Sequence, residues 1–362
     1  MSGLITGMIL YICIVPTTLI MYFLLYPKNW RSKKRIYGVN NRAEFKTDKS
    51  GEYIDSLVSV HNRQAGVITI GVIVVATALL FVPGLTAKTM SMTVLVLVAL
   101  FAIMVPYALG NSQLKKYKKV LGLVCEKVLY ADLKTAGNIH ALSKPMIYAA
   151  DLAGILILAL ALLCDTGVLP VNMGVYSGTF ICTAMAGSLI AVSLIMLPIA
   201  FIVDNSRNEV ISENSDINAN YNRSRKKIYA DYFITVSWID NAFALIMILS
   251  LVFLRQEIVT LVILGICLLA IMAATALFAK KSIAHSRRYM TEEADLVEDD
   301  DDYWILGMFY YNPKDRHLNI SKRAGIGSTV NIAHPAGKVI TGIGILAIIA
   351  ALMTLVWVGM MG

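Results

Sequence analysis

Long apolar stretches alternate with polar segments along this chain. Reading windows of about 20 residues gives eight apolar spans, and a helix of that length covers the roughly 30 Å of hydrocarbon in a bilayer. The pattern predicts an all-α membrane protein with about eight transmembrane helices, at residues 4–25, 65–83, 90–109, 146–168, 179–203, 233–254, 258–279 and 338–360.

Composition supports this interpretation and excludes an ordinary soluble domain. Of the 362 residues, 57% are hydrophobic and 15% are charged, whereas soluble domains carry roughly 25% charged residues. The first span has no basic segment before it and ends in Tyr22-Phe23-Leu24-Leu25-Tyr26. Because a cleaved signal peptide has a basic start and a small-residue cleavage site, we expect this span to be a retained helix.

The distribution of Lys and Arg predicts the orientation. Four polar segments, 26–64, 110–145, 204–232 and 280–338, contain 30 of the 32 basic residues. Basic loops stay on the cytoplasmic side during insertion, so these segments are expected inside and both termini outside. The net charge of +8 then faces anionic headgroups, and no nucleic-acid partner is expected.

Four regions follow from these spans. Residues 1–145 form an N-terminal membrane region of three helices with basic loops, and residues 146–290 form a middle membrane domain of four helices. Residues 291–337 form a cytoplasmic acidic-aromatic module, and residues 338–362 the C-terminal helix. The Asn-, Ser- and Asp-rich stretch Asn205–Asn222 is expected to be largely irregular.

The acidic-aromatic module is the most distinctive segment. Eight acids occur in residues 291–302, and five aromatic residues follow between Tyr303 and Tyr311. That aromatic density predicts a small ordered module packed on the membrane surface. Asn312-Pro313 indicates a turn, and Gly325 and Gly327 allow unusual backbone conformations. Short extended pieces are expected around four apolar residues, Ile320, Ile326, Val330 and Ile332.

The function of the acidic run 292–302 has three interpretations. Its carboxylates could hold Ca²⁺ or Mg²⁺, although the run lacks the spaced ligands of an EF-hand loop. It could pair with basic residues of a neighbouring loop, for example around Lys33–Arg35. It could also be a solvated tether, because runs of like charge repel one another.

Two further inner segments carry aromatic residues among basic ones. Trp30 and Tyr37 lie in the basic stretch after the first span and predict an anchor at headgroup depth. Leu114, Tyr117 and Leu121 share one face of an expected helical extension of the third span.

The C-terminal segment resembles a known module. The run from Asp302 to Asn331, with its aromatic residues, Asn312-Pro313, Lys322-Arg323 and Gly325-x-Gly327, is similar to a module of unknown function in bacterial polytopic membrane proteins that belong to, or lie beside, the SdpI-like family. Tyr26-Pro27 and the segment from Asp204 to Tyr232 also resemble these proteins. One departure is that the outer turn 167–174 lacks the histidine that the family usually has there.

This resemblance implies a multi-pass protein of a bacterial cytoplasmic membrane that acts in peptide-toxin immunity or in envelope signalling. Its implied partners are a toxic peptide and a cytoplasmic protein such as a repressor. The candidate functional residues of the module are Tyr303, Trp304, Tyr311, Asn312, Pro313, Asp315, Lys322, Arg323, Gly325, Gly327, Thr329 and Asn331.

Catalytic motifs are absent from the sequence. It contains no HExxH, no GxSxG and no Walker lysine, and its five histidines are scattered. Its five cysteines lack a CxxC pair and are expected to be apolar fillers. We therefore expect no catalytic residue, metal site or cofactor.

Asp240, next to Asn241, is the candidate functional residue within a span. A charged residue at mid-membrane costs about 2.5–3.5 kcal/mol and is a functional suspect. It could make a helix–helix hydrogen bond, or it could bind a proton or a ligand. The leading hypothesis is a non-enzymatic immunity or signalling protein that acts through its cytoplasmic loops. The alternative is a transporter, or transporter subunit, with Asp240 near the substrate or proton path.

Overall fold

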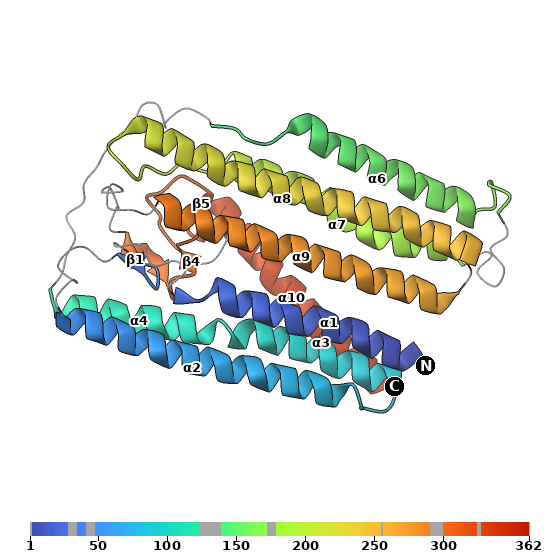
Figure 1. Ribbon diagram of the computed structural model, residues 1–362, viewed down its shortest axis with the longest axis horizontal. Helices are drawn as coiled ribbons and strands as arrows, with labels where there is room; N and C mark the ends of the chain where they lie inside the picture. Colours follow the sequence, from blue (N-terminus) through green and yellow to red (C-terminus); the bar gives the residue numbers. More distant parts are fainter. Residues whose placement is uncertain are drawn as a thin grey trace. The chain divides into compact units, whose positions relative to one another are not determined.

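A computed structural model describes residues 2–27, 35–40, 48–122, 139–171, 179–254, 256–289, 300–323 and 327–361. Long helices dominate these residues (Figure 1). Their bounds are α1 Ser2–Leu24, α2 Asp48–Leu79, α3 Leu85–Ala102, α4 Val105–Val120, α6 Lys144–Asp165, α7 Ile181–Asp204, α8 Ser215–Leu249, α9 Glu257–Tyr289 and α10 Pro335–Met361.

All eight predicted spans fall on helices. Among the described residues, seven stretches are long and apolar enough to cross a membrane, and α3 and α4 together make one of them. The eighth predicted span falls in α10. Several helices extend well beyond the predicted spans: α8 begins at Ser215, within the stretch that was expected to be irregular. Helical structure is confirmed, and its extent in the polar segments was underestimated.

Proline explains why one predicted span, 90–109, is divided between two helices. α3 ends at Ala102 and α4 begins at Val105, with Pro106 in the first turn of α4. Proline fits the first turn of a helix because the amide hydrogen that it lacks has no partner there. Pro16 and Pro198, in contrast, lie inside the continuous helices α1 and α7.

The chain divides into two compact units. The first comprises residues 1–13, 140–205 and 224–278. Its core lies between α6, α7, α8 and α9 and is rich in small residues, among them Ala161, Ala186 and Ala244. Small side chains let apolar helices approach closely. Cys164, Cys182 and Cys267 are buried there as free thiols, which confirms them as apolar fillers.

The second unit comprises residues 14–139, 206–223 and 279–362. Within it, α2 runs alongside α3 and α4 (Figure 1). A core at the polar ends of these helices joins Ile54 and Leu57 of α2 to Tyr107 and Leu114 of α4. The same core buries Tyr37. The prediction of Tyr37 as a surface anchor is therefore wrong, whereas Trp30 lies outside the described residues.

Three short antiparallel hairpins occur in the second unit, so the all-α prediction is incomplete. β1 (Arg35–Ile36) pairs with β2 (Val39–Asn40), β3 (Trp304–Ile305) with β4 (Phe309–Tyr310), and β5 (Asn319–Ser321) with β6 (Ser328–Val330). A parallel bridge from Tyr310 to Asn331 connects the last two hairpins. The predicted ordered module is thus built from strands, and Ile320 and Val330 lie in them as expected, while Ile332 follows β6 in a turn.

Candidate functional site

The aromatic residues of the module form its core. Trp304 and Tyr310 are partners across the β3–β4 hairpin, are both buried, and have ring centroids 5.1 Å apart. Ile320 of β5 completes this cluster, with Tyr303 packed against it. Alternation along a strand places Ile305 and Phe309 on the opposite face of the hairpin, where both are exposed. The hairpin therefore has one packed aromatic face and one exposed apolar face.

Asn331 is the polar centre of the module. Its side-chain oxygen accepts hydrogen bonds from the backbone nitrogens of Asn312 (3.0 Å) and Ala333 (3.1 Å). Its side-chain nitrogen donates to the carbonyl oxygens of Asn312 (2.9 Å) and Asp315 (3.0 Å). Asn331 is fully buried, so one amide satisfies four backbone groups that would otherwise lose water without compensation.

The segment after Asn331 starts the last helix. The ring nitrogen Nδ1 of His334 accepts a hydrogen bond from the backbone of Ala336 (3.2 Å), and Pro335 is the first residue of α10. Gly337 lies directly against the carbonyl of Asn331, with no room for a Cβ atom. The helix therefore begins in contact with the Asn331 cluster because residue 337 is glycine.

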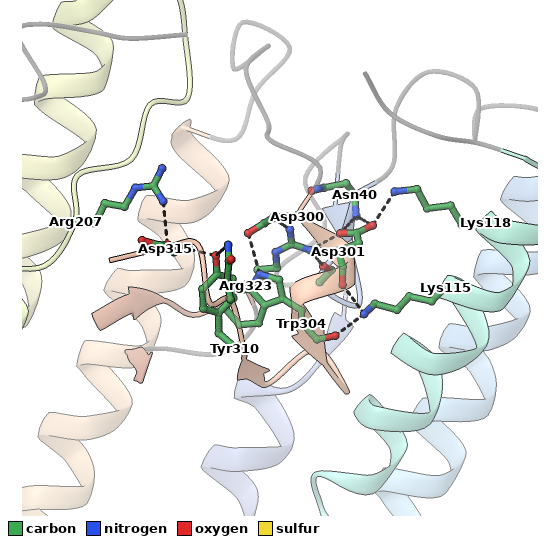
Figure 2. A network of polar contacts seen from close by, with 12 residues as sticks. Asn40, Lys115, Lys118, Arg207, Asp300, Asp301, Trp304, Tyr310, Asp315 and Arg323 are labelled. Carbon is green, nitrogen blue, oxygen red and sulfur yellow. Dashed lines mark hydrogen bonds and ion pairs between the residues drawn. The ribbon is translucent and has the colours of Figure 1, made fainter. Parts of the chain in front are cut away.

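A buried ion-pair network surrounds Asp301 (Figure 2). Its carboxylate accepts hydrogen bonds from the backbone of Asn40 in β2 (3.1 Å), from Lys118 of α4 (2.7 Å) and from Arg323. The Lys118 and Asp301 side chains are both less than a tenth exposed. Buried charges persist only when they are paired and hydrogen-bonded. Asp301 therefore fixes the module to α4 and to the β1–β2 hairpin.

Arg323 is the second centre of this network. Its guanidinium pairs with Asp300 as well as Asp301, donates to the carbonyl of Gly38 (2.6 Å), and lies 5.2 Å from the centre of the Trp304 ring. The planar guanidinium suits such a site because it forms several directed hydrogen bonds and stacks on aromatic faces. Figure 2 shows Arg323 between the two aspartates.

Lys115 of α4, the helix that carries Lys118, also contacts the module. Its ammonium donates to the backbone carbonyl of Asp301 (2.6 Å) and to that of Trp304. Lys115 and Lys118 are three residues apart and therefore lie on one face of α4. Two lysines of one helix thus reach into the start of the module.

Asp315 forms a smaller cluster on the other side of the module (Figure 2). It accepts hydrogen bonds from the Tyr310 hydroxyl (3.3 Å), from His317 (2.8 Å) and from Arg207 (3.3 Å). Burial favours a raised pKa for Asp315, but the hydrogen bonds from His317 and the charge of Arg207 outweigh it and lower the pKa. Burial raises the pKa of Tyr310 to about 12, so its hydroxyl stays protonated and donates.

These contacts distinguish between the interpretations of the acidic run where it is described. Asp300 and Asp301 pair with basic residues, as one interpretation held, and their described partners include Lys118 and Arg323. Lys33 and Lys34, named in that interpretation, lie outside the described residues. Asp302 lies 3.9 Å from Lys119, with both side chains exposed, and such surface pairs contribute little. The run up to residue 299 lies outside the described residues.

The predicted site residues separate into buried and exposed groups. Trp304, Asn312, Arg323 and Asn331 are buried, and the structure brings them together. Tyr311, Pro313 and Lys322 are exposed. Thr329 lies in β6, Gly327 has a φ of 105°, and Gly325 lies outside the described residues.

Four partners of the module were not predicted from the sequence: Asn40, Lys115, Lys118 and Arg207. A lysine within the basic run Lys115–Lys119 resembles a solvated residue. The available signal was that Lys118 follows Leu114 by four residues and therefore shares its buried face. Leu121, which was expected on the face of Leu114, is exposed.

Asp240 and Asn241 lie in the first unit, buried in α8. Asn241 donates a hydrogen bond to the carbonyl of Ala150 in α6 (2.6 Å), next to Gly154. One of the two interpretations of Asp240 was a helix–helix hydrogen bond, and in the structure its neighbour Asn241 makes such a bond. Among the described residues, neither carboxylate oxygen of Asp240 has a hydrogen-bond partner.

Two other acids of this unit, Asp151 and Asp165, are also buried. Asp165 accepts hydrogen bonds from the backbone nitrogens of Cys182 (3.3 Å) and Thr183 (2.7 Å) and so caps the start of α7. Asp151 of α6 has no hydrogen-bond partner for either oxygen among the described residues. Within the same residues, no group of three or more His, Cys, Asp or Glu side chains could hold a metal ion.

Comparison with known proteins adds one match. Residues 313–338 match a family model described as "Family of unknown function (DUF5808)". The matched segment contains Asp315, Arg323, Asn331 and Gly337, which hold the module together and start α10. No curated protein and no solved structure matches the chain.

Proposed function

We propose that this chain is a non-enzymatic multi-pass membrane protein of a bacterial cytoplasmic membrane, in which the module at residues 291–337 acts on the inner face. Seven described helical stretches of suitable length and hydropathy support the crossing. The concentration of Lys and Arg in four segments supports an inner location for the module and outer termini. The proposed role is peptide-toxin immunity or envelope signalling, as the SdpI-like resemblance implies.

The observation that carries this role is the buried network at Asp301. It joins the module to α4, the polar end of an apolar helix, through the ion pair with Lys118. Because breaking a buried ion pair leaves an uncompensated charge, a shift of α4 in the bilayer moves the module instead of releasing it. An event within the membrane, such as binding of a toxic peptide, would thereby reach a cytoplasmic partner such as a repressor.

A strain that lacks the gene for this protein tests both versions of the role. Its survival in culture supernatant from the parent strain reports immunity to secreted peptides, and its transcript profile reports signalling. We expect the deletion to lower survival or to change a small set of transcripts. The wild-type gene and Asp302→Asn should restore the phenotype, and Asp301→Asn should restore it poorly at equal membrane abundance. A deletion strain identical to its parent in both measurements would remove the proposal.

One observation favours a second candidate, transport that depends on Asp240. A fully buried carboxyl group whose two oxygens lack hydrogen-bond partners among the described residues is costly in an apolar bundle, and such groups mark proton and ion pathways. Reconstituted vesicles with a pH gradient and an entrapped dye test this. Asp240→Asn should abolish proton flux, whereas Asp231→Asn, at an exposed position of the same helix, should not. No flux through the wild-type protein would contradict this candidate.

A further inference from the structure

The β3–β4 hairpin has the wrong surface for a hairpin in water. Its cross-strand pair Ile305 and Phe309 is 49% and 48% exposed, and Leu306 at the turn is 45% exposed. On a two-sided hairpin, the face away from the core is ordinarily polar. Here three neighbouring apolar side chains occupy it, while Trp304 and Tyr310 fill the packed face.

The turn of the hairpin also exposes an apolar residue where a polar one would be expected. Leu306 and Gly307 have φ values of 54° and 70°, and the backbone nitrogen of Met308 bonds to the carbonyl of Ile305 (3.2 Å). Two positive φ values between strands are typical of a type I′ turn, which prefers Asn-Gly. Leucine is unfavourable in this conformation. An exposed leucine where asparagine would suit both backbone and water indicates that the side chain has a separate role.

The hairpin lies where α4 changes from apolar to polar. Gly307 packs against Tyr107 and Asn111 of α4. Just before this point α4 exposes Val105 and Leu109, and just after it α4 exposes Lys116. From Leu109 to Lys116 the helix rises only about 10 Å. The tip is therefore level with the boundary between an apolar belt and a basic belt.

We propose that the tip of the hairpin, Ile305, Leu306 and Phe309, inserts into the headgroup region of an anionic lipid bilayer. This rests on the proposed function, because it assumes that α4 leaves the membrane near Asn111. Apolar side chains beside basic ones are the pattern by which interfacial segments bind anionic membranes. Insertion holds the module at the bilayer surface from one side, while Lys118 and Asp301 hold it to α4 from another.

Depth-dependent quenching tests the proposal on the full chain. Single-cysteine variants Ile305→Cys and Phe309→Cys, in a background with the native cysteines replaced by alanine, carry an environment-sensitive fluorophore. The protein is reconstituted as one chain per nanodisc of phosphatidylglycerol and phosphatidylethanolamine, with or without brominated acyl chains. Arg316→Cys, at an exposed position of the module, and Ile155→Cys, on the outside of α6, are the controls.

We expect brominated lipid to quench the labels at 305, 309 and 155 but not the label at 316. Quenching at 155 without quenching at 305 and 309 overturns the insertion and leaves the membrane crossing intact. No quenching at 155 overturns the proposed function. Because each nanodisc holds one chain, a second copy cannot cover the label in this measurement. If the fluorophore at position 305 becomes buried from solvent only at high protein concentration in detergent, the hairpin contacts another copy instead of lipid, and this result also overturns the proposal.

The variant Leu306→Asn separates insertion from folding. Asparagine suits the turn, so we expect the hydrogen-exchange protection of β3 and β4 in detergent to be kept or increased. In nanodiscs, the same variant should reduce quenching of the label at 305. Unchanged quenching in this variant would contradict a role for Leu306 in the contact with lipid.

Discussion

Lys118 Nζ lies 2.7 Å from Asp301 Oδ2, and both side chains are almost completely buried. Lys119, the next residue, lies 3.9 Å from Asp302 with both side chains exposed. The two lysines are neighbours in the sequence, and so are the two aspartates. The pairs therefore form a matched comparison of a buried and a surface ion pair.

The first prediction uses this comparison. Lys118→Met should destabilise attachment of the module to α4 by about 3 kcal/mol, because it leaves part of the charge on Asp301 uncompensated. Lys119→Met should change it by less than about 1 kcal/mol. Hydrogen exchange of residues 300–323 in the full chain measures the difference. Equal protection in the two variants would contradict the role assigned to Lys118.

The second prediction concerns Asn331. Asn331→Ala removes a side chain that bonds to four backbone groups in a fully buried position. Each unsatisfied buried group costs about 1–3 kcal/mol, so we expect residues 312–333 to lose protection from proteolysis. Lys314→Ala, at an exposed position of the same turn, is the control. A variant as resistant as the wild type would show that other groups hold the turn.

The third prediction concerns the start of α10. Gly337→Ala places a Cβ atom against the carbonyl of Asn331 and should destabilise the junction between module and helix. Gly342→Ala and Gly344→Ala, in the same helix with open space around them, should be neutral or stabilising by about 0.5–1 kcal/mol because alanine favours helix. Thermal unfolding in detergent measures all three. Equal behaviour of the three variants would contradict close packing at Gly337.

The fourth prediction concerns pH. The pKa of Asp315 is lowered from its ordinary value of 3.8, so its contribution to stability is present above that value and is lost as the pH falls through the lowered pKa. Asp315→Asn should cost about 1 kcal/mol at neutral pH and should flatten the stability profile of the module below about pH 4. Hydrogen exchange corrected for intrinsic rates provides the profile. Parallel profiles for variant and wild type would contradict this assignment.

The sequence predicted the helices well because a bilayer-length apolar stretch is a strong signal that depends on no partner. The polar segments were harder, since α8 begins at Ser215 and β1 with β2 forms a hairpin in a stretch that reads as a surface anchor. Their structure depends on contacts with distant residues, such as Asn40 with Asp301. Local patterning does not contain that information.

The candidate site likewise contains residues that could be predicted from the sequence and residues that could not. Trp304, Asn312, Arg323 and Asn331 could be identified because unusual residues at fixed spacing carry the resemblance, and the structure brings them together. Lys118 could not, because within a basic run only its buried partner distinguishes it from its neighbours. For Asp240 the sequence indicated an unusual position, and the structure shows that Asn241 makes the hydrogen bond to α6 instead.

The proposed function requires that the chain crosses the membrane with the module on the inner face. Labelling of single cysteines in intact cells with a membrane-impermeant maleimide tests it directly, with the native cysteines replaced by alanine. Thr166→Cys, at the end of α6, should react in intact cells, and Arg316→Cys should react only after lysis. Reaction of Arg316→Cys in intact cells would contradict the claim.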